Sequence, residues 1–282
     1  MVSCNSYFRL ALVALGFPFL GLVAYGLWVE PNQIGARHIW IEDPPLAEVL
    51  GEKVVVHLSD LHIDRLGRRE QRVLQVLEEL EPDLIFLTGD YVTWQGNYQA
   101  ALDFLRRLKA RVGVWAVMGD YDYSRSRKSC LFCHEKGSGK STLRHSVKFL
   151  RNSYEKVDLP GGFIWIGGMD GETERPYSSE RKMLPGKPLG PTIILSHNPL
   201  LFDLLNEDQS VLMLSGDTHG GQIPLPPWLW KTLGYEKSAR YGQGLFENGR
   251  RKMFVSRGIG TSHIPIRLFR RPEVVVLHFT PK

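Results

Sequence analysis

Aspartate and histidine residues follow five short apolar segments of this chain, each at the point where the segment ends. The residues concerned are Asp60 and His62 after residues 54–59, Asp90 after 84–89, Asp120 after 114–119, His197 after 192–196, and Asp217 and His219 after 211–216. Carboxylate oxygen and neutral imidazole nitrogen are donors that bind Mn, Fe or Zn, and a carboxylate can bridge two such ions. These ligands exceed the needs of one ion. They predict a pair of divalent ions that clamps a phosphate and activates a bridging hydroxide.

The five apolar segments are typical of β-strands covered on both faces, because they are short and almost continuously apolar. Leucines and valines at helical spacing lie between the first three, over residues 69–80 and 98–108. Strand, helix and strand in succession predict parallel strands, whose carboxyl ends meet at one ligand-binding edge of a sheet. An Asp after a strand can instead cap a helix, and a lone His can be a hydrogen-bonded core residue. Five such strand ends at one edge favour a metal site.

In these residues the chain resembles the calcineurin-like metallophosphoesterases, whose sequence blocks are D-x-H, G-D, G-N-H-D, an isolated His and G-H-x-H. The matching positions are residues 60–62, 89–90, 119–122, 197 and 216–219. The resemblance implies an α/β four-layer sandwich over residues 51–282, with two mixed β-sheets packed face to face and flanked by helices. We expect the strand at residues 274–279 to close the second sheet, and an amphipathic helix over residues 142–152.

The resemblance also implies the roles of individual residues. By it, Asp60, His62, Asp90 and His219 hold one ion, while Asp90, Asp120, His197 and Asp217 hold the other. Water between the ions would attack phosphorus in line, and His197 and Arg267 would stabilise the developing charge. The N-terminus and residues 256–262 and 265–267 are similar to a membrane-attached bacterial branch of the family. Some members of that branch cleave the pyrophosphate of UDP-2,3-diacylglucosamine.

Three positions depart from the family pattern: Asp120 replaces Asn, Tyr121 replaces His, and Asp217 replaces His. Two divalent ions with the usual two carboxylates carry about +2, whereas the four carboxylates here bring the same pair to about zero. Tyr121 can donate a hydrogen bond to a leaving group, but with a reference pKa of about 10 it is a poorer acid than histidine. We therefore expect a phosphoesterase with altered catalysis. The alternative is an exported haem or metal-binding protein built on the same scaffold.

A loop at residues 124–141 contains Cys130, Cys133 and His134 in the order C-x-x-C-H. This is the attachment pattern of c-type haem, in which both thiols bond the haem and the histidine ligates the iron. A disulfide, a partial zinc site or two free thiols are the alternatives. The loop is longer than the family resemblance leads us to expect, so we interpret it as an insertion.

The N-terminal residues 1–29 predict a membrane anchor. Arg9 precedes an uncharged apolar stretch, residues 10–28, that is about long enough to cross a bilayer as a helix. No small-residue cleavage pattern follows it, which favours an uncleaved anchor over a signal peptide, and a buried core helix is the other alternative. Arg9 predicts a cytoplasmic N-terminus, and hence a single-pass inner-membrane protein with its catalytic domain outside the cytoplasm. Residues 30–50 would be a linker with at most one short strand.

The composition is that of a globular protein, and the 282 residues carry a net charge of +5. This charge suits anionic partners without selecting among them. We expect the lipid bilayer and a phosphorylated small-molecule or lipid substrate as partners, and no nucleic acid. Residues 223–230 carry two tryptophans, either for the membrane headgroup region or for hydrophobic packing.

Overall fold

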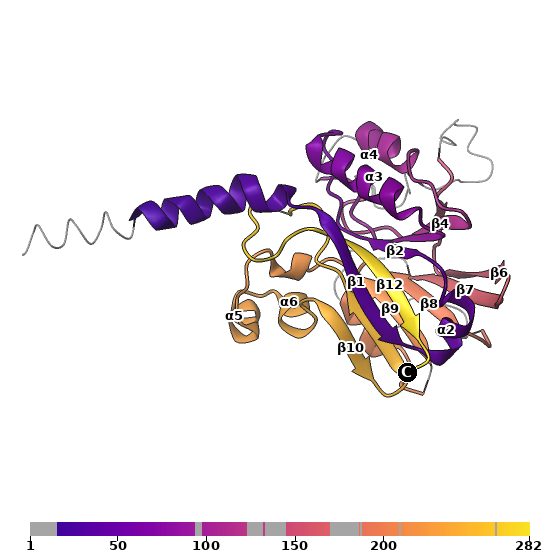
Figure 1. Cartoon of the computed structure of the whole chain (residues 1–282). Coiled ribbons are helices and arrows are strands. Elements are labelled where there is room, and N and C mark those ends of the chain that lie inside the picture. The colour runs from indigo at the N-terminus through magenta and orange to yellow at the C-terminus, as the bar shows by residue number, and fades with distance from the viewer. Residues whose placement is uncertain are drawn as a thin grey trace, which may run out of the picture.

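Two six-stranded sheets form the frame of the protein (Figure 1). The structure is a computed structural model, and it describes residues 16–93, 98–122, 132, 145–169, 186, 188–208, 210–262 and 264–282. The first sheet has the order β1 (Gly35–Glu42), β12 (Glu273–Thr280), β2 (Val55–Leu58), β3 (Leu84–Leu87), β4 (Gly113–Ala116) and β5 (Lys148–Phe149). The second has the order β10 (Gly244–Asn248), β11 (Arg251–Val255), β9 (Val211–Ser215), β8 (Thr192–Ser196), β7 (Gly162–Met169) and β6 (Ser153–Leu159). Both sheets mix parallel and antiparallel pairs.

The strands that precede the predicted ligands form as the apolar segments indicated. β2, β3 and β4 are parallel neighbours in one sheet, and β8 and β9 are parallel neighbours in the other. Every residue of β2, β3, β8 and β9 is buried, which explains why these strands are apolar without alternation. Their carboxyl ends therefore deliver the polar residues that follow them to one region of the molecule.

The two sheets pack face to face through one apolar cluster. Phe86 and Trp115 from the first sheet and Leu195, Leu212 and Phe254 from the second are buried together in it. The other face of the first sheet is covered by α3 (Arg68–Leu80) and α4 (Tyr98–Leu105), and η3 (Pro199–Leu204) packs on the second sheet. The predicted α/β architecture of two mixed sheets with helices is confirmed.

Residues 30–50 are more ordered than the predicted linker. They form η2 (Glu30–Asn32), the eight-residue strand β1 and α2 (Pro44–Leu50), and β1 pairs in parallel with β12 along its whole length. Pro44 can open α2 because the first helical residue needs no N–H donor, and the Asp43 side chain accepts the N–H of Leu46 at 3.0 Å. The prolines that suggested a linker instead start a helix.

The last strand, β12, lies in the first sheet and not in the second, so the prediction for residues 274–279 was wrong. It pairs in parallel with β1 and antiparallel with β2. β12 therefore has a partner on each side, which matches its continuous run of buried valines.

The helix predicted over residues 142–152 is also not formed, because Lys148 and Phe149 are strand β5. They pair with Trp115 and Ala116 of β4, and the N–H of Leu150 donates to the carbonyl of Ala116 at 2.9 Å. This pairing satisfies backbone groups at the open edge of β4, which would have no strand partner if these residues formed a helix. Residues 142–144 lie outside the described part of the chain.

A helix over residues 16–24 continues into η1 (Tyr25–Val29) and extends away from the sheets (Figure 1). Phe17 and Trp28 are 73% and 71% exposed on it. Within the described residues, no helix combines the length and the apolar character needed to cross a bilayer. Part of the predicted span, residues 10–15, lies outside those residues.

Candidate active site

Five predicted ligands meet at the carboxyl ends of strands from both sheets. They are almost fully buried and are Asp60 and His62 after β2, Asp90 after β3, His197 after β8, and His219 in η4 (His219–Gly221) after β9. Most have left-handed backbone, with φ of 50° at Asp60, 43° at His62, 56° at Asp90 and 52° at His219. Non-glycine residues avoid this region, and strain of this kind gathers at functional sites. The surrounding fold holds these residues in a backbone conformation that they would not adopt by themselves.

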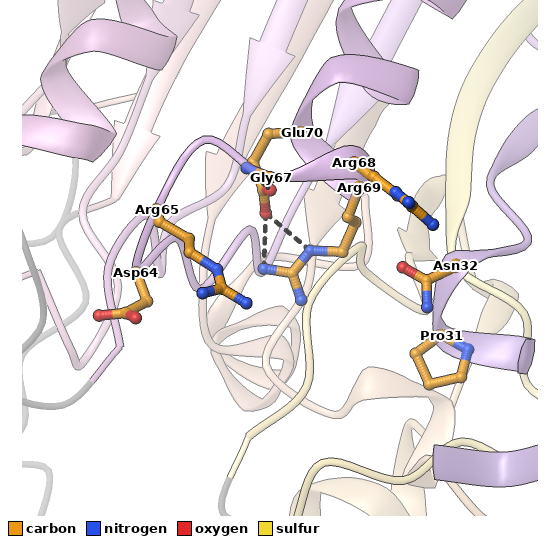
Figure 2. A pocket seen from close by; sticks show the side chains of 8 residues that line it. All are labelled: Pro31, Asn32, Asp64, Arg65, Gly67, Arg68, Arg69 and Glu70. Atoms are coloured by element: carbon orange, nitrogen blue, oxygen red, sulfur yellow. Dashed lines mark hydrogen bonds and ion pairs between the residues drawn. The ribbon is translucent and has the colours of Figure 1, made fainter. Parts of the chain in front are cut away.

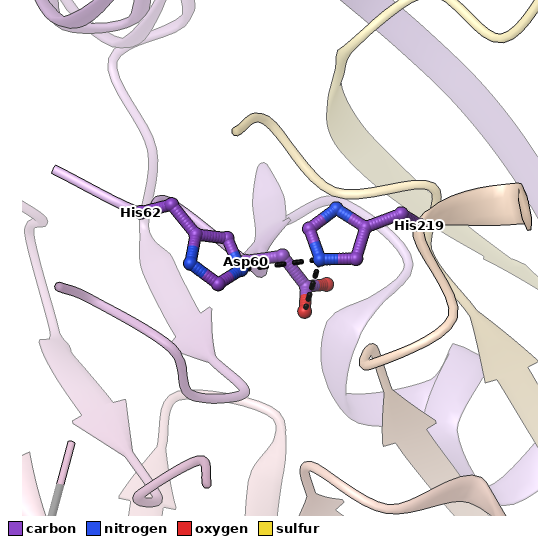
Figure 3. Close-up of side chains that lie close together, drawn as sticks. All are labelled: Asp60, His62 and His219. Carbon is purple, nitrogen blue, oxygen red and sulfur yellow. Dashed lines mark hydrogen bonds and ion pairs between the residues drawn. The ribbon is translucent and has the colours of Figure 1, made fainter. Parts of the chain in front are cut away.

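His62, His219 and Asp60 form the first group of donors (Figure 3). The Nε2 atoms of His62 and His219 are 3.1 Å apart, and the Nε2 of His219 lies 3.6 Å from Oδ1 of Asp60. Metal bonds of about 2.0–2.2 Å in a tetrahedral site separate neighbouring ligand atoms by about 3.3–3.6 Å. The spacing of these donors fits a shared divalent ion.

Asp60, Asp90 and His197 form the second group. The Nδ1 of His197 donates to the carbonyl of Thr88 at 2.7 Å, which directs Nε2 toward Oδ2 of Asp90 at 3.4 Å. Among the described residues, Nε2 has no hydrogen-bond partner. Burial lowers the pKa of His197, but the neighbouring Asp90 carboxylate outweighs this and holds the pKa above its ordinary value. A proton or a metal ion therefore has to lie between these two side chains.

Asp90 connects the two groups. Its Oδ2 is 3.5 Å from Nε2 of His62 and 3.4 Å from Nε2 of His197. Burial raises the pKa of Asp60 to about 7, so the carboxylate form of Asp60 needs a compensating positive charge. Oriented imidazoles, an unpartnered buried nitrogen and buried carboxylates together fit a metal centre.

The structure places Asp120 and Asp217 differently from the other predicted ligands. Among the described residues, neither joins the two donor groups. Their carboxylates face Lys237, whose Nζ binds Oδ2 of Asp217 and lies 3.8 Å from Oδ2 of Asp120. Asp217 contributes its backbone instead, because its N–H donates to Oδ1 of Asp60 at 3.0 Å.

Tyr121 packs against the centre through its ring, which meets the ring of His62 edge to face at 5.0 Å. Its backbone N–H donates to Oδ1 of Asp90 at 2.9 Å. Burial, followed by the charge of Asp90, raises the pKa of Tyr121 to about 12. Near neutral pH the hydroxyl stays protonated and is a weak proton donor to a leaving group.

Arg267 is fully buried and supports the site from behind. Its guanidinium donates to the carbonyls of Gly260, Arg270 and Arg257, and Nη2 lies 3.5 Å from Nδ1 of His219. These carbonyls accept most of the N–H groups that a contact with phosphate would require. The geometry makes Arg267 a positioning residue for the loop after β11 and for His219.

Asp122 is a site residue that the sequence prediction missed. Its side chain is fully buried and accepts the backbone N–H groups of Asp90 at 2.7 Å, Tyr91 at 2.6 Å and Gly119 at 2.8 Å. It therefore joins the loops that follow β3 and β4. Asp122 is the last residue of the block aligned with G-N-H-D, and this place in the block was the signal that could have identified it.

The haem residues Cys130, Cys133 and His134 lie outside the described part of the chain, and haem attachment stays a prediction.

Residues 53–231, more than half of the chain, match the calcineurin-like phosphoesterase family. The chain belongs to this family. It is 28% identical to the metallophosphoesterase YkuE of Bacillus subtilis, with 94% of this chain and 92% of YkuE covered. It is 29% identical to the phosphodiesterase YaeI of Escherichia coli, covering 79% and 80% of the two chains. Identity to the UDP-2,3-diacylglucosamine pyrophosphatase LpxG of Chlamydia trachomatis is 26%, covering 88% and 90%.

As a calcineurin-like phosphoesterase, the protein is a hydrolase of phosphoester bonds. Divalent metals serve this chemistry in the family, and the two donor groups around Asp60 are the candidate ligands.

Proposed function

We propose that this calcineurin-like phosphoesterase hydrolyses a phosphodiester or pyrophosphate bond of a lipid-linked or nucleotide-linked substrate at a membrane surface. The observation that carries the proposal is the convergence of five buried metal donors at the strand ends of two sheets. Relatives named as a phosphodiesterase and as a UDP-2,3-diacylglucosamine pyrophosphatase support this class of bond.

The residues of the chain have distinct tasks in this reaction. Asp60, His62, Asp90 and His219 would hold a divalent metal, which supplies Lewis acidity and lowers the pKa of water, and His197 lies beside Asp90 as a further donor. The Thr88 carbonyl fixes the tautomer of His197, and Asp122 fixes the backbone that carries Asp90. Asp217 N–H and the ring of Tyr121 enclose the donors from the side of the altered motifs.

The apolar helix at residues 16–29 supports a location at the membrane surface, because its base is joined to the active-site loops. The carbonyl of Gly26 accepts the N–H of Arg267 at 2.9 Å, and Arg267 lies behind His219. Glu30 is buried and accepts the N–H groups of Phe269 and Arg270. Trp28 and Phe269 are 71% and 65% exposed beside this junction. An apolar helix inserted in lipid would hold the metal centre close to the headgroups.

A pocket of about 430 Å³, lined mainly by residues that follow the donors Asp60 and His62 in the chain, supports a phosphorylated substrate (Figure 2). Its lining holds three arginines and two carboxylates beside Gly67 and two residues of η2: Arg65, Arg68, Arg69, Asp64, Glu70, Pro31 and Asn32. Arg69 is held by Glu70 and by the carbonyls of Leu61 and His62, whereas Arg65 and Arg68 are exposed. Guanidinium groups match phosphate oxygens in geometry and charge, so this pocket suits the second phosphate or the headgroup of a substrate.

Turnover of a chromogenic phosphodiester by the purified full chain, with Mn, Fe, Zn or Mg added in turn, tests the proposal. We expect metal-dependent hydrolysis that Asp90→Ala abolishes. Asp103→Ala is a matched control, because Asp103 is a partly exposed carboxylate of α4 that pairs with Arg106 and belongs to neither donor group. Folded protein without turnover under every metal would overturn the proposal.

A further inference from the structure

Lys237 joins the two altered ligand positions of the metal centre. It lies on α6 (Glu236–Arg240), and its Nζ contacts Oδ2 of Asp217 and Oδ2 of Asp120. The two carboxylates come from the loops after β9 and β4, which belong to different sheets. One ammonium group therefore closes the side of the centre on which the sequence departs from its family.

This ammonium group takes up the carboxylates that a second ion would need. Asp120 and Asp217 occupy the positions that the family resemblance assigns to that ion, together with Asp90 and His197. With both carboxylates facing Lys237, Asp90 and His197 are left as the second ion's own ligands, and Asp60 is shared with the first group. Metal sites in proteins use three or four protein ligands, so two ligands of its own and one shared ligand put a second ion at the lower limit of that range.

Charge acts in the same direction. An ammonium group and a divalent cation a few ångströms apart repel each other strongly when both are partly shielded from water. The Lys237 side chain is 18% exposed, as is that of Asp217. The ammonium group of Lys237 neutralises the carboxylate of Asp217, so no second metal ion is needed to balance that charge.

We propose that the centre is mononuclear, with one divalent ion at Asp60, His62, His219 and Asp90, and with the Lys237 ammonium in place of the second cation. The inference rests on the proposed function only for the first ion. Lys237 would then offer N–H donors to a phosphate oxygen on the side where relatives of this fold would use metal.

Counting bound ions tests the inference without any activity measurement. The full chain is equilibrated with Mn²⁺, and bound Mn is measured by elemental analysis and by electron paramagnetic resonance. For the wild type we expect one tightly bound Mn per chain, with the spectrum of an isolated ion. Lys237→Met removes the charge but keeps the apolar stem, and should tighten binding of a second Mn by about tenfold or more.

Controls make each outcome decisive. Lys231→Met in α5 (Pro227–Thr232) removes an exposed lysine of the neighbouring helix and should leave the count at one. Combining Lys237→Met with Asp217→His restores a family ligand and should give a spin-coupled pair. Lys237→Gln serves if the Met variant does not fold. Two ions of similar affinity in the wild type, or no change with either Lys237 variant, would overturn the inference. A wild type that binds no metal would overturn the proposed function as well.

Discussion

His62 and His219, 157 residues apart in the chain, bring their Nε2 atoms to 3.1 Å from each other in a buried site. Burial lowers the pKa of both imidazoles, that of His62 to about 4, so both are neutral near pH 7. Two neutral imidazole nitrogens that face each other can share one hydrogen bond or ligate one cation together. The pair therefore fits a divalent ion.

Metal should stabilise the folded protein through this pair. Mn²⁺ at about 100 times its Kd adds about 2.7 kcal/mol to the free energy of unfolding, which raises Tm by roughly 5 °C or more in a protein of this size. His62→Ala should lose most of this shift, as measured by thermal unfolding with Mn²⁺ or with a chelator. His278→Ala, a histidine of the half-exposed His38 and His278 pair, is the control and should keep it. An unchanged shift in His62→Ala would contradict the assignment.

Asp122→Asn should weaken both the fold and the metal centre. An amide can accept at one atom only, so the N–H of Tyr91, or those of Asp90 and Gly119, would face an NH₂ group in a buried site. An unsatisfied buried donor costs about 1–3 kcal/mol. Chemical denaturation should show that loss, and Mn affinity should fall because Asp90 loses its backbone support. Asp103→Asn is the exposed counterpart and should change neither quantity.

Tyr121→His should raise kcat, because a histidine near its ordinary pKa of about 6.5 donates a proton at neutral pH more readily than a tyrosine with a pKa of about 12. General acid catalysis is worth about a hundredfold or more in favourable geometry, so even partial alignment should be measurable. Tyr121→Phe should change kcat by less than about tenfold. A Phe variant with a much larger loss would show that the hydroxyl takes part in the reaction.

Arg65→Gln and Arg68→Gln should raise KM by about threefold to tenfold for a substrate with two phosphates, with kcat nearly unchanged. The lining of the pocket contains residues that follow Asp60 and His62 in the chain, but none of the metal donors. Arg72→Gln on α3 is the control, because Arg72 is an exposed arginine paired with Glu79. A fall in kcat at constant KM would show that the pocket acts on chemistry and not on binding.

Acid should destabilise the protein through His57. This residue is buried in β2 with Nε2 at 2.8 Å from the Thr88 hydroxyl, and burial lowers its pKa from 6.5 to about 3. The folded pKa is depressed, so the stabilisation is complete above pH 6.5 and is lost as pH falls toward 3, because the unfolded chain takes up a proton that the folded chain does not. The slope reaches about 1.4 kcal/mol per pH unit.

His57→Gln should remove this slope, as seen by urea denaturation of wild type and variant between pH 7 and pH 4. Asp60 acts in the opposite direction in metal-free protein, since its raised pKa favours the folded state as pH falls from about 7. Its contribution is common to both proteins and cancels in the difference. Parallel pH profiles for the two proteins would show that His57 titrates normally.

Residues that are local to a strand were predictable from the sequence. The apolar segments before Asp60, Asp90 and His197 form β2, β3 and β8, and the donors follow at the strand ends as expected. Strand termini depend on short-range features, because an apolar run must stop where its side chains leave the core. The family blocks then assigned these ends to one metal centre.

Residues whose role depends on distant partners were not predictable in this way. The family resemblance predicted that Arg267 stabilises the developing charge on phosphate. In the structure its guanidinium is buried and donates to three backbone carbonyls. β12 could have joined either sheet by its apolar pattern, and the presence of β1 beside it settled the choice. Local pattern does not specify which neighbour an element will find.

The sequence by itself determined the family and the parallel strands, and it predicted seven metal ligands that include the five buried donors, because motifs and strand ends depend on a few adjacent residues. Only the tertiary structure decided that Asp120 and Asp217 face Lys237 and that Asp122 ties two loops together. Lys237 lies 20 residues beyond Asp217, on a helix whose position depends on packing. The charge that balances the altered ligands comes from that packing, which no local spacing in the chain encodes.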